Sequence, residues 1–249
     1  MADSTRRACG ATLAGVLLGA CAGGAQNDTA RVRLRSFPGK ETQLPKPGTY
    51  PLNLRPQRDA LLYVPGSLPS DQPAPLVVFL HGATGNEQRG LRFLSAYADD
   101  FRFLLLVPAS EDGTWDAIQG AFGPDVRFID RALERVFQMC RVDPKKVAIS
   151  GFSDGASYAL GLGMSNGRLF GSVMAFSPGF VPSGVQSEGR PRFFLSHGTA
   201  DRILPIDQCS RSLVPRLKAA GYEVEYREFD GPHTLPRDVG DIAMRWFLT

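Results

Sequence analysis

The sequence lacks the features that mark several large classes of protein. It has no apolar run long enough to cross a bilayer as a helix, no internal repeat and no dense run of lysine and arginine. Its formal net charge of +3 is spread over 249 residues, so we expect no nucleic-acid partner. With 43% hydrophobic and 21% charged residues, the chain can form one globular domain with a full core.

The first 21 residues have the pattern of an export signal. A pair of arginines precedes a short, weakly apolar run, which ends in Leu18-Gly19-Ala20-Cys21 and resembles a bacterial lipobox. We predict a signal peptide over residues 1–21, lipidation at Cys21 and anchoring to the outer membrane. Ordinary cleavage, giving a periplasmic or secreted protein, is the alternative. Residues 22–48 are polar, with Gly and Pro, and predict a flexible tether.

Short apolar runs alternate with helical patterns through the rest of the chain. Strands are predicted at Asp59–Pro65, Leu76–Leu80, Phe103–Val107, Val147–Ser150, Ser172–Phe176, Phe193–Ser196 and Glu223–Phe229. Helices are predicted near residues 90–100, 125–140, 154–165, 208–220 and 237–248. Asp143-Pro144 predicts a turn before the fourth strand. The alternation predicts an α/β fold, with a mostly parallel central sheet and helices on both faces.

Only two cysteines lie beyond the predicted signal peptide, Cys140 and Cys209. Export would permit a disulfide between them. Cys140, however, ends a predicted helix near one edge of the sheet, and Cys209 begins a predicted helix near the opposite edge. We therefore expect two buried free thiols, with a disulfide as the alternative.

In parallel sheets, ligands bind where the strands end, so the residues after each strand are the candidates for a site. Gly151-Phe152-Ser153-Asp154-Gly155 stands between a predicted strand and a predicted helix. This is the Gly-x-Ser-x-Gly pattern of a nucleophile elbow, whose tight turn exposes a serine hydroxyl above the sheet. We predict that Ser153 is a nucleophile and not merely a helix cap.

A serine nucleophile needs a base, and the chain offers three histidines: His81, His197 and His233. In the α/β-hydrolase chain order, the acid follows the serine and the histidine follows the acid. Only His233 comes after both Ser153 and a well-placed acid, so we predict His233 as the base. We expect His81 to brace its loop.

The acid should follow the penultimate strand of this predicted sheet. Asp201 stands there, and it would orient the imidazole and stabilise its charged form. Asp207, at a helix start, and Asp230, on a different connection, are the alternatives.

Two preorganised N–H groups are needed to stabilise an oxyanion. The residue after the nucleophile, Asp154, supplies one of them. The loop His81-Gly82-Ala83-Thr84-Gly85 follows a buried strand and should supply the other. We predict the N–H of Ala83, with Thr84 as the alternative.

Together these motifs resemble the α/β-hydrolase superfamily over about residues 50–249. The likeness is greatest to the esterases grouped with polyhydroxybutyrate depolymerases, feruloyl esterases and phospholipase/carboxylesterase proteins. It is carried by residues 81–85, 142–144, 151–155, 197–201, Leu204-Pro205 and 231–233. The resemblance implies a catalytic domain over residues 49–249 that cleaves esters through an acyl-enzyme intermediate. Asp154 departs from the small or amide residue often found after the serine. The resemblance therefore indicates the mechanism more than any one substrate.

Many lipases insert a cap domain after the strand that follows the nucleophile, but only a short loop, residues 177–189, is present here. An open site without a cap is therefore expected, and it would accept a small-molecule ester or an ester on a polymer. The expected pocket walls are Trp115, Asp116, Phe180, Ile203, Leu204 and Leu235.

An open-site carboxylesterase or polymer-ester hydrolase is thus the predicted function. A serine peptidase of the same fold would use the same machinery, and a non-catalytic, surface-tethered binding module would keep the same fold. Both stay as alternatives. The sequence shows no metal-ligand cluster and no phosphate-binding loop, so we expect no cofactor and no metal.

Overall fold

The computed structural model describes residues 32–39 and 43–249. Its strands are β1 (Gly48–Pro51), β2 (Ala60–Val64), β3 (Ala74–Leu80), β4 (Leu104–Pro108), β5 (Val142–Phe152), β6 (Ser172–Phe176), β7 (Arg192–Gly198) and β8 (Val224–Phe229). Its helices are α1 (Glu87–Phe101), α2 (Asp116–Gln119), α3 (Pro124–Met139), α4 (Asp154–Ser165), α5 (Ser210–Ala219) and α6 (Arg237–Leu248).

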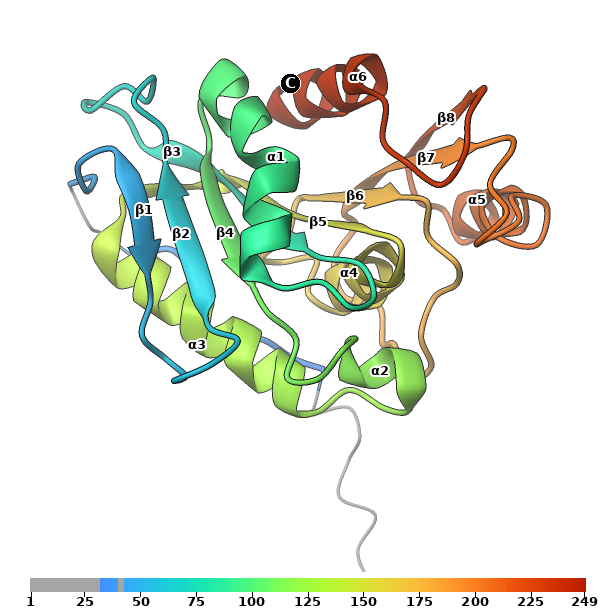
Figure 1. The fold of residues 1–249 in the computed structure, drawn as a ribbon, viewed down its shortest axis with the longest axis horizontal. Coiled ribbons are helices and arrows are strands. Elements are labelled where there is room, and N and C mark those ends of the chain that lie inside the picture. The colour runs from blue at the N-terminus through green and yellow to red at the C-terminus, as the bar shows by residue number, and fades with distance from the viewer. Residues whose placement is uncertain (1–31, 40–42) are drawn as a thin grey trace, which may run out of the picture.

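A single eight-stranded sheet in the order β1-β2-β4-β3-β5-β6-β7-β8 forms the centre of the molecule (Figure 1). The six strands from β4 to β8 in this order are parallel to one another. Only β1 and β2 are antiparallel to the strands beside them. The predicted mostly parallel sheet is therefore present, and the described residues contain no cap domain between β6 and β7.

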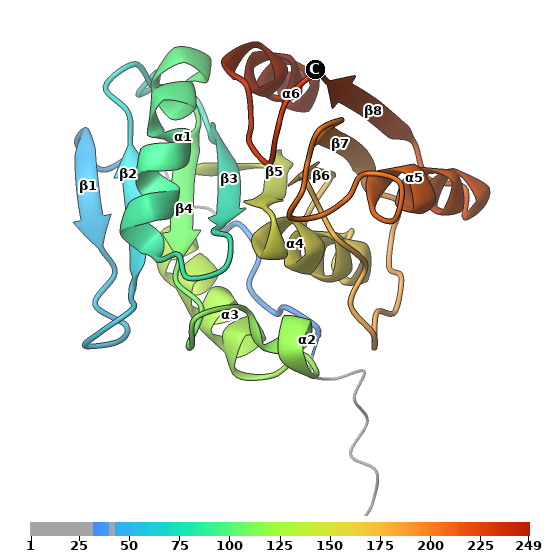
Figure 2. The ribbon, with the colours of Figure 1, turned by 45° about the vertical axis from the view of Figure 1, so that its right-hand side comes forward.

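Helices cover both faces of this sheet because its central strands are apolar on both sides. In β3, Val77 and Phe79 pack on the side of α1 and α6, whereas Leu76, Val78 and Leu80 pack on the side of α3, α4 and α5. This alternation follows from the two-residue period of a strand. Figure 2 shows α1 and α6 next to each other on their face of the sheet.

Strand β5 differs from its prediction. It begins at Val142, which pairs with Ala74, and the pairing then jumps so that Val147 lies opposite Leu76. In the extra segment the carboxylate of Asp143 accepts a hydrogen bond from Lys145 N at 2.9 Å. The predicted Asp143-Pro144 turn is thus an irregularity within a strand and not the boundary of one.

Part of the predicted tether is packed against the domain. Val32 and Leu34 are buried in the main core, and Leu34 N donates to Asn166 Oδ1 at 2.8 Å. The backbone of Arg35 donates to Asp130 at 2.9 Å. The apolar side chains alternate over too few residues to stand out in a polar segment, so the prediction for residues 22–48 is wrong for residues 32–36. The packed domain begins before residue 49.

Several predictions fall outside the described residues. These are the signal peptide over residues 1–21, the lipidation of Cys21 and the first part of the tether. None of the described helices has the length and the apolar character needed to cross a membrane. Cys140 and Cys209 are both buried and free, as expected.

Candidate active site

Ser153 occupies the sharp turn between β5 and α4, in a backbone conformation that few non-glycine residues adopt (φ 58°, ψ −122°). The turn is tight because the two flanking glycines touch other backbone. A Cβ on Gly151 would lie 2.3 Å from the carbonyl carbon of Gly155, and a Cβ on Gly155 would lie 2.1 Å from Leu80 O. The Gly-x-Ser-x-Gly pattern therefore forms the predicted elbow.

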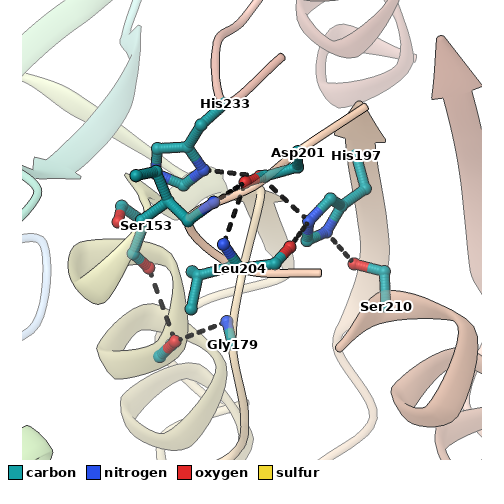
Figure 3. A network of polar contacts seen from close by, with 9 residues as sticks. Ser153, Gly179, His197, Asp201, Leu204, Ser210 and His233 are labelled. Atoms are coloured by element: carbon teal, nitrogen blue, oxygen red, sulfur yellow. Dashed lines mark hydrogen bonds and ion pairs between the residues drawn. The ribbon is translucent and has the colours of Figure 1, made fainter. Parts of the chain in front are cut away.

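Two loops bring His233 and Asp201 to the same edge of the sheet. His233 follows β8, Asp201 follows β7, and the His233 Nδ1 lies 2.6 Å from Asp201 Oδ2. His233 and Ser153 line the same cavity. Figure 3 shows the imidazole of His233 between Ser153 and Asp201. The structure thus brings together the three residues predicted as a triad.

Asp201 is almost fully buried, and its two carboxylate oxygens have different partners. The Oδ1 accepts from the backbone N–H groups of Ile203 and Leu204, both at 2.9 Å. Burial alone would raise the pKa of Asp201, but the hydrogen bonds from Leu204, His233 and Ile203 outweigh it, so the pKa lies below its usual value. The competing acid, Asp207, is exposed and pairs with Arg211 at 2.8 Å.

The contact with Asp201 determines the tautomer of His233. A carboxylate only accepts hydrogen bonds, so Nδ1 carries the proton and Nε2 is left with a free lone pair. The ring also packs on Phe152, the residue before the serine, with 4.6 Å between ring centroids. His233 is therefore oriented as a base whose free nitrogen can take a proton.

The two predicted oxyanion donors lie at the start of α4 and in the loop after β3. Asp154 is the first residue of α4, so its N–H has no acceptor within the helix. The N–H of Ala83 has no acceptor among the described residues. Thr84 N donates to Gly113 O at 2.6 Å, which removes the alternative donor. Gly82 keeps this loop close to the elbow, since a Cβ there would lie 3.2 Å from Ser153 Cβ.

His81 is buried beneath this loop. Its Nε2 accepts from Ser110 N at 3.1 Å, so Nδ1 carries the proton and donates to Gly82 O at 2.8 Å. Burial lowers the pKa of His81 to about 4, which keeps the ring neutral at physiological pH. His81 therefore braces the loop, as expected.

His197 has a place that the sequence reasoning missed. The sequence offers it only as a rival base, but it lies on the far side of Asp201 from His233, with Nε2 at 3.2 Å from Asp201 Oδ2 (Figure 3). The signal was its spacing of four residues before Asp201, across the end of β7.

A cavity of about 370 Å³ opens beside Ser153. Aromatic rings form much of its wall, and its lining includes Phe79, Phe93, Phe152, Arg89, Gly90, Ile203 and His233. Phe93 stacks on Phe79 and also contacts Phe152, each with ring centroids 5.2 Å apart. The cavity is therefore suited to an apolar group next to the serine.

Most of the predicted pocket walls lie elsewhere. Trp115 is fully buried in the core, where its Nε1 donates to His81 O at 2.8 Å, so its prediction as a substrate-binding residue is wrong. Phe180 and Leu204 do not line this cavity and lie instead around Gly179, beyond the elbow. Ile203 does line it.

Asp116, also predicted as a pocket wall, is half-buried and pairs with the buried carboxylate of Asp125 under the loop after β4. Its Oδ2 accepts from the backbone of Asp125 at 2.9 Å and its Oδ1 from Tyr158 at 3.0 Å. Asp125 accepts from Glu111 N at 2.7 Å and from Asp116 N at 2.9 Å. Burial raises the pKa of both carboxyls, that of Asp125 to about 6.

The carboxylate beside the nucleophile is also held in place. Asp154 Oδ2 accepts from the hydroxyl of Thr114 at 2.7 Å. The loop after β4 therefore fixes the one residue of the elbow that departs from the usual pattern.

Residues 110–244, which include Ser153, Asp201 and His233, match the family described as Phospholipase/Carboxylesterase. The chain is also similar to the bifunctional acetylxylan esterase/xylanase XynS20E of Neocallimastix patriciarum, with 29% identity over 158 residues. This stretch is 61% of the chain and 22% of that protein, so the chain spans about a fifth of the length of the curated relative it matches.

Two solved structures have the same fold. One is the S-formylglutathione hydrolase FrmB from Staphylococcus aureus, with TM-score 0.64, 15% identity, and 83% of this chain and 99% of that chain covered. The other is the acetyl xylan esterase from Aspergillus awamori, with TM-score 0.60, 17% identity, and coverage of 80% and 98%. The predicted α/β-hydrolase fold is confirmed.

Proposed function

Because the chain belongs to the phospholipase/carboxylesterase family of α/β-hydrolases, we propose that it hydrolyses carboxylic esters through an acyl-enzyme intermediate. In this proposal Ser153 is the nucleophile, His233 the general base and Asp201 the acid that orients it. The observation that carries the proposal is the 2.6 Å contact between His233 Nδ1 and Asp201 Oδ2, at a cavity that His233 shares with Ser153.

The reaction would begin with attack of Ser153 Oγ on the ester carbonyl carbon, while His233 Nε2 takes the hydroxyl proton. The negative charge that develops on the carbonyl oxygen would be stabilised by the N–H groups of Ala83 and Asp154. When the tetrahedral intermediate collapses, the bond to the alcohol breaks and His233 returns the proton to the departing oxygen. Water, activated by the same base, would then release the acid and restore Ser153.

The cavity beside Ser153 supports an ester with an apolar group of moderate size. The loop between β6 and β7 is short, so a substrate can reach the elbow without the opening of a cap, which suits a small ester or an ester on a polymer. The names of two relatives add acetylxylan as a polymeric ester to test.

The test is hydrolysis of p-nitrophenyl esters from acetate to palmitate by residues 22–249, beside the Ser153→Ala variant. We expect activity that depends on Ser153, is highest with short and medium acyl chains, and falls with palmitate. Covalent labelling by a fluorophosphonate should occur in the parent protein and be lost in Ser153→Ala. Labelling that persists in Ser153→Ala would place the nucleophile elsewhere.

We further propose that the protein is exported and anchored through a lipid on Cys21. This rests on the pattern of the first 21 residues alone. The mass of the N-terminal peptide of the membrane-associated protein should show a diacylglyceryl group on Cys21, and Cys21→Ala should release the protein from the membrane fraction. An unmodified N-terminus after Ala22 would favour simple secretion.

A further inference from the structure

His197 is a buried histidine that the proposed mechanism does not use. It lies at the end of β7 and is fully buried. Its Nε2 is 3.2 Å from Asp201 Oδ2 and 2.8 Å from Leu204 O, and its Nδ1 is 2.7 Å from Ser210 Oγ. In Figure 3, Asp201 lies between the imidazoles of His197 and His233.

The neighbours of His197 determine which of its nitrogens carries the proton. Nε2 faces a carbonyl oxygen and a carboxylate oxygen, which can only accept, so Nε2 must be the donor. Nδ1 faces the hydroxyl of Ser210, which can donate to it. Burial lowers the pKa of His197, in agreement with a neutral ring.

We propose that His197 is a positioning residue for the ester hydrolysis proposed above, and the inference rests on that function. Its Nε2–H donates to Leu204 O at 2.8 Å, and Nε2 lies 3.2 Å from the same oxygen of Asp201 that accepts from His233 Nδ1. The carboxylate accepts hydrogen bonds from His233 Nδ1 and from the backbone N–H groups of Ile203 and Leu204, and His197 is the fourth N–H group beside it. The orientation of the carboxylate is thereby fixed with respect to His233.

The same contact also sets how strongly Asp201 favours a charged His233. A carboxylate oxygen with a second N–H group beside it stabilises the imidazolium of His233 less than an unshared oxygen would. The Nε2–H of His197 therefore competes with His233 for the same oxygen of Asp201. Ser210 adds to this effect, since donation into Nδ1 makes the Nε2–H of His197 a stronger donor.

The His197→Leu variant tests the proposal because it removes the donor and keeps an apolar side chain in the site. We expect kcat/KM to fall roughly 10- to 100-fold, the range for loss of a polar interaction with a charged group. We also expect the acidic limb of the pH profile of kcat/KM, which reports the base of the free enzyme, to move to higher pH. His197→Gln carries an N–H on a side chain of similar reach and should return the limb most of the way to its original position.

A role in packing alone would lower thermal stability and leave the acidic limb in place. Ser196→Ala is the matched control, because Ser196 is the fully buried neighbour of His197 and its hydroxyl has no partner among the described residues. Its acidic limb should not move. Ser210→Ala should move the limb in the same direction as His197→Leu, by a smaller amount.

Fluorophosphonate labelling of the parent protein, and its loss in Ser153→Ala, is measured first. A failure of the proposed ester hydrolysis is thereby distinguished from a failure of the positioning role of His197. An acidic limb that stays in place in both His197→Leu and Ser210→Ala overturns the positioning role. If His197→Leu does not fold, the pH profiles of kcat/KM for Ser210→Ala and His197→Gln test the positioning role instead. An acidic limb that does not move in Ser210→Ala then overturns the proposal.

Discussion

Two buried carboxylates lie at the carboxyl edge of the sheet, and their surroundings shift their pKa values in opposite directions. Asp201, after β7, has a lowered pKa, whereas Asp125, at the start of α3, has a pKa raised to about 6. Both are almost completely buried and both accept two backbone N–H groups. Burial raises the pKa of both carboxyls and is the largest influence on each, but only at Asp201 do the hydrogen bonds outweigh it.

The charged or polar side chains next to each carboxylate add to the difference. Asp201 has an imidazole on each side: His233 donates to it, and His197 Nε2 lies 3.2 Å from the same oxygen. Asp125 has a second carboxylate, Asp116, as its neighbour, which disfavours its ionised form. The first arrangement keeps a negative charge available to a base at neutral pH. The pair of Asp116 and Asp125 links the loop after β4 to α2 and α3, at a cost in electrostatic energy.

The largest expected effect is on catalysis and belongs to Asp201 alone. Asp201→Asn should lower kcat by about 10⁴, since an amide favours the wrong tautomer of His233. Steady-state hydrolysis of the best p-nitrophenyl ester measures it. Asp207→Asn is the control, because that exposed carboxylate pairs only with Arg211 and should leave kcat within a few-fold. An equal loss of kcat in Asp125→Asn would show that the two carboxylates do not differ in their importance for catalysis.

The second prediction concerns the dependence of stability on pH. Folding raises the pKa of Asp125 from 3.8 to about 6, so the folded protein holds this proton to a higher pH than the unfolded chain does. The contribution of Asp125 to the free energy of unfolding therefore falls as the pH rises from about 4 to about 6, by about 3 kcal/mol in total. Asp201 acts in the opposite sense, because its lowered pKa adds stability that is lost only when the pH falls below about 4.

Urea unfolding of the parent protein and of Asp125→Asn between pH 4 and pH 7 separates these contributions. The difference between the two proteins should change with pH by the amount given for Asp125 alone, since all other groups cancel. A difference that is constant across this range would show that Asp125 has an ordinary pKa in the folded protein.

The fold and the site differ in how far the sequence could reveal them. The central strands could be predicted because β3 and β4 are apolar on both faces, and the elbow because Gly151 and Gly155 touch backbone at positions where no side chain fits. Ser153, Asp201 and His233 could be placed together because each follows a parallel strand, and such strands end at the same edge.

Other residues could not be placed because their roles depend on contacts between distant segments. The local sequence of a tryptophan after β4 does not show whether its ring faces a cavity or the core. The ring of Trp115 faces the core, where its Nε1 donates to the carbonyl of His81. Asp116 and Asp125 look like helix-start carboxylates until the loop between them folds back. The packing of Val32 depends on a surface made by α4, more than a hundred residues later.

A smaller effect is expected where Tyr158 supports the carboxylate pair. Tyr158→Phe removes the hydroxyl that donates to Asp116 Oδ1 at 3.0 Å and keeps the buried ring. The free energy of unfolding should fall by about 1–2 kcal/mol at pH 7, and kcat should stay within a few-fold. Tyr63→Phe is the control, since its hydroxyl bonds an exposed Asp99 and its loss should cost less. Equal losses in both variants would mean that burial of the carboxylate pair adds nothing to the hydrogen bond.

The smallest effect is expected on the apolar side of Ser153, where no carboxylate is involved. Phe93 is half-buried in the wall of the cavity, so Phe93→Ala should widen it and shift the preference among p-nitrophenyl esters toward longer acyl chains by a few-fold in kcat/KM. The pH profile should not change, because Phe93 touches neither Asp201 nor Asp125. Phe101→Ala, on the same helix but outside the cavity, should leave the preference as it is. A preference that shifts equally in both variants would mean that α1 as a whole, and not the ring of Phe93, sets the size of the acyl group.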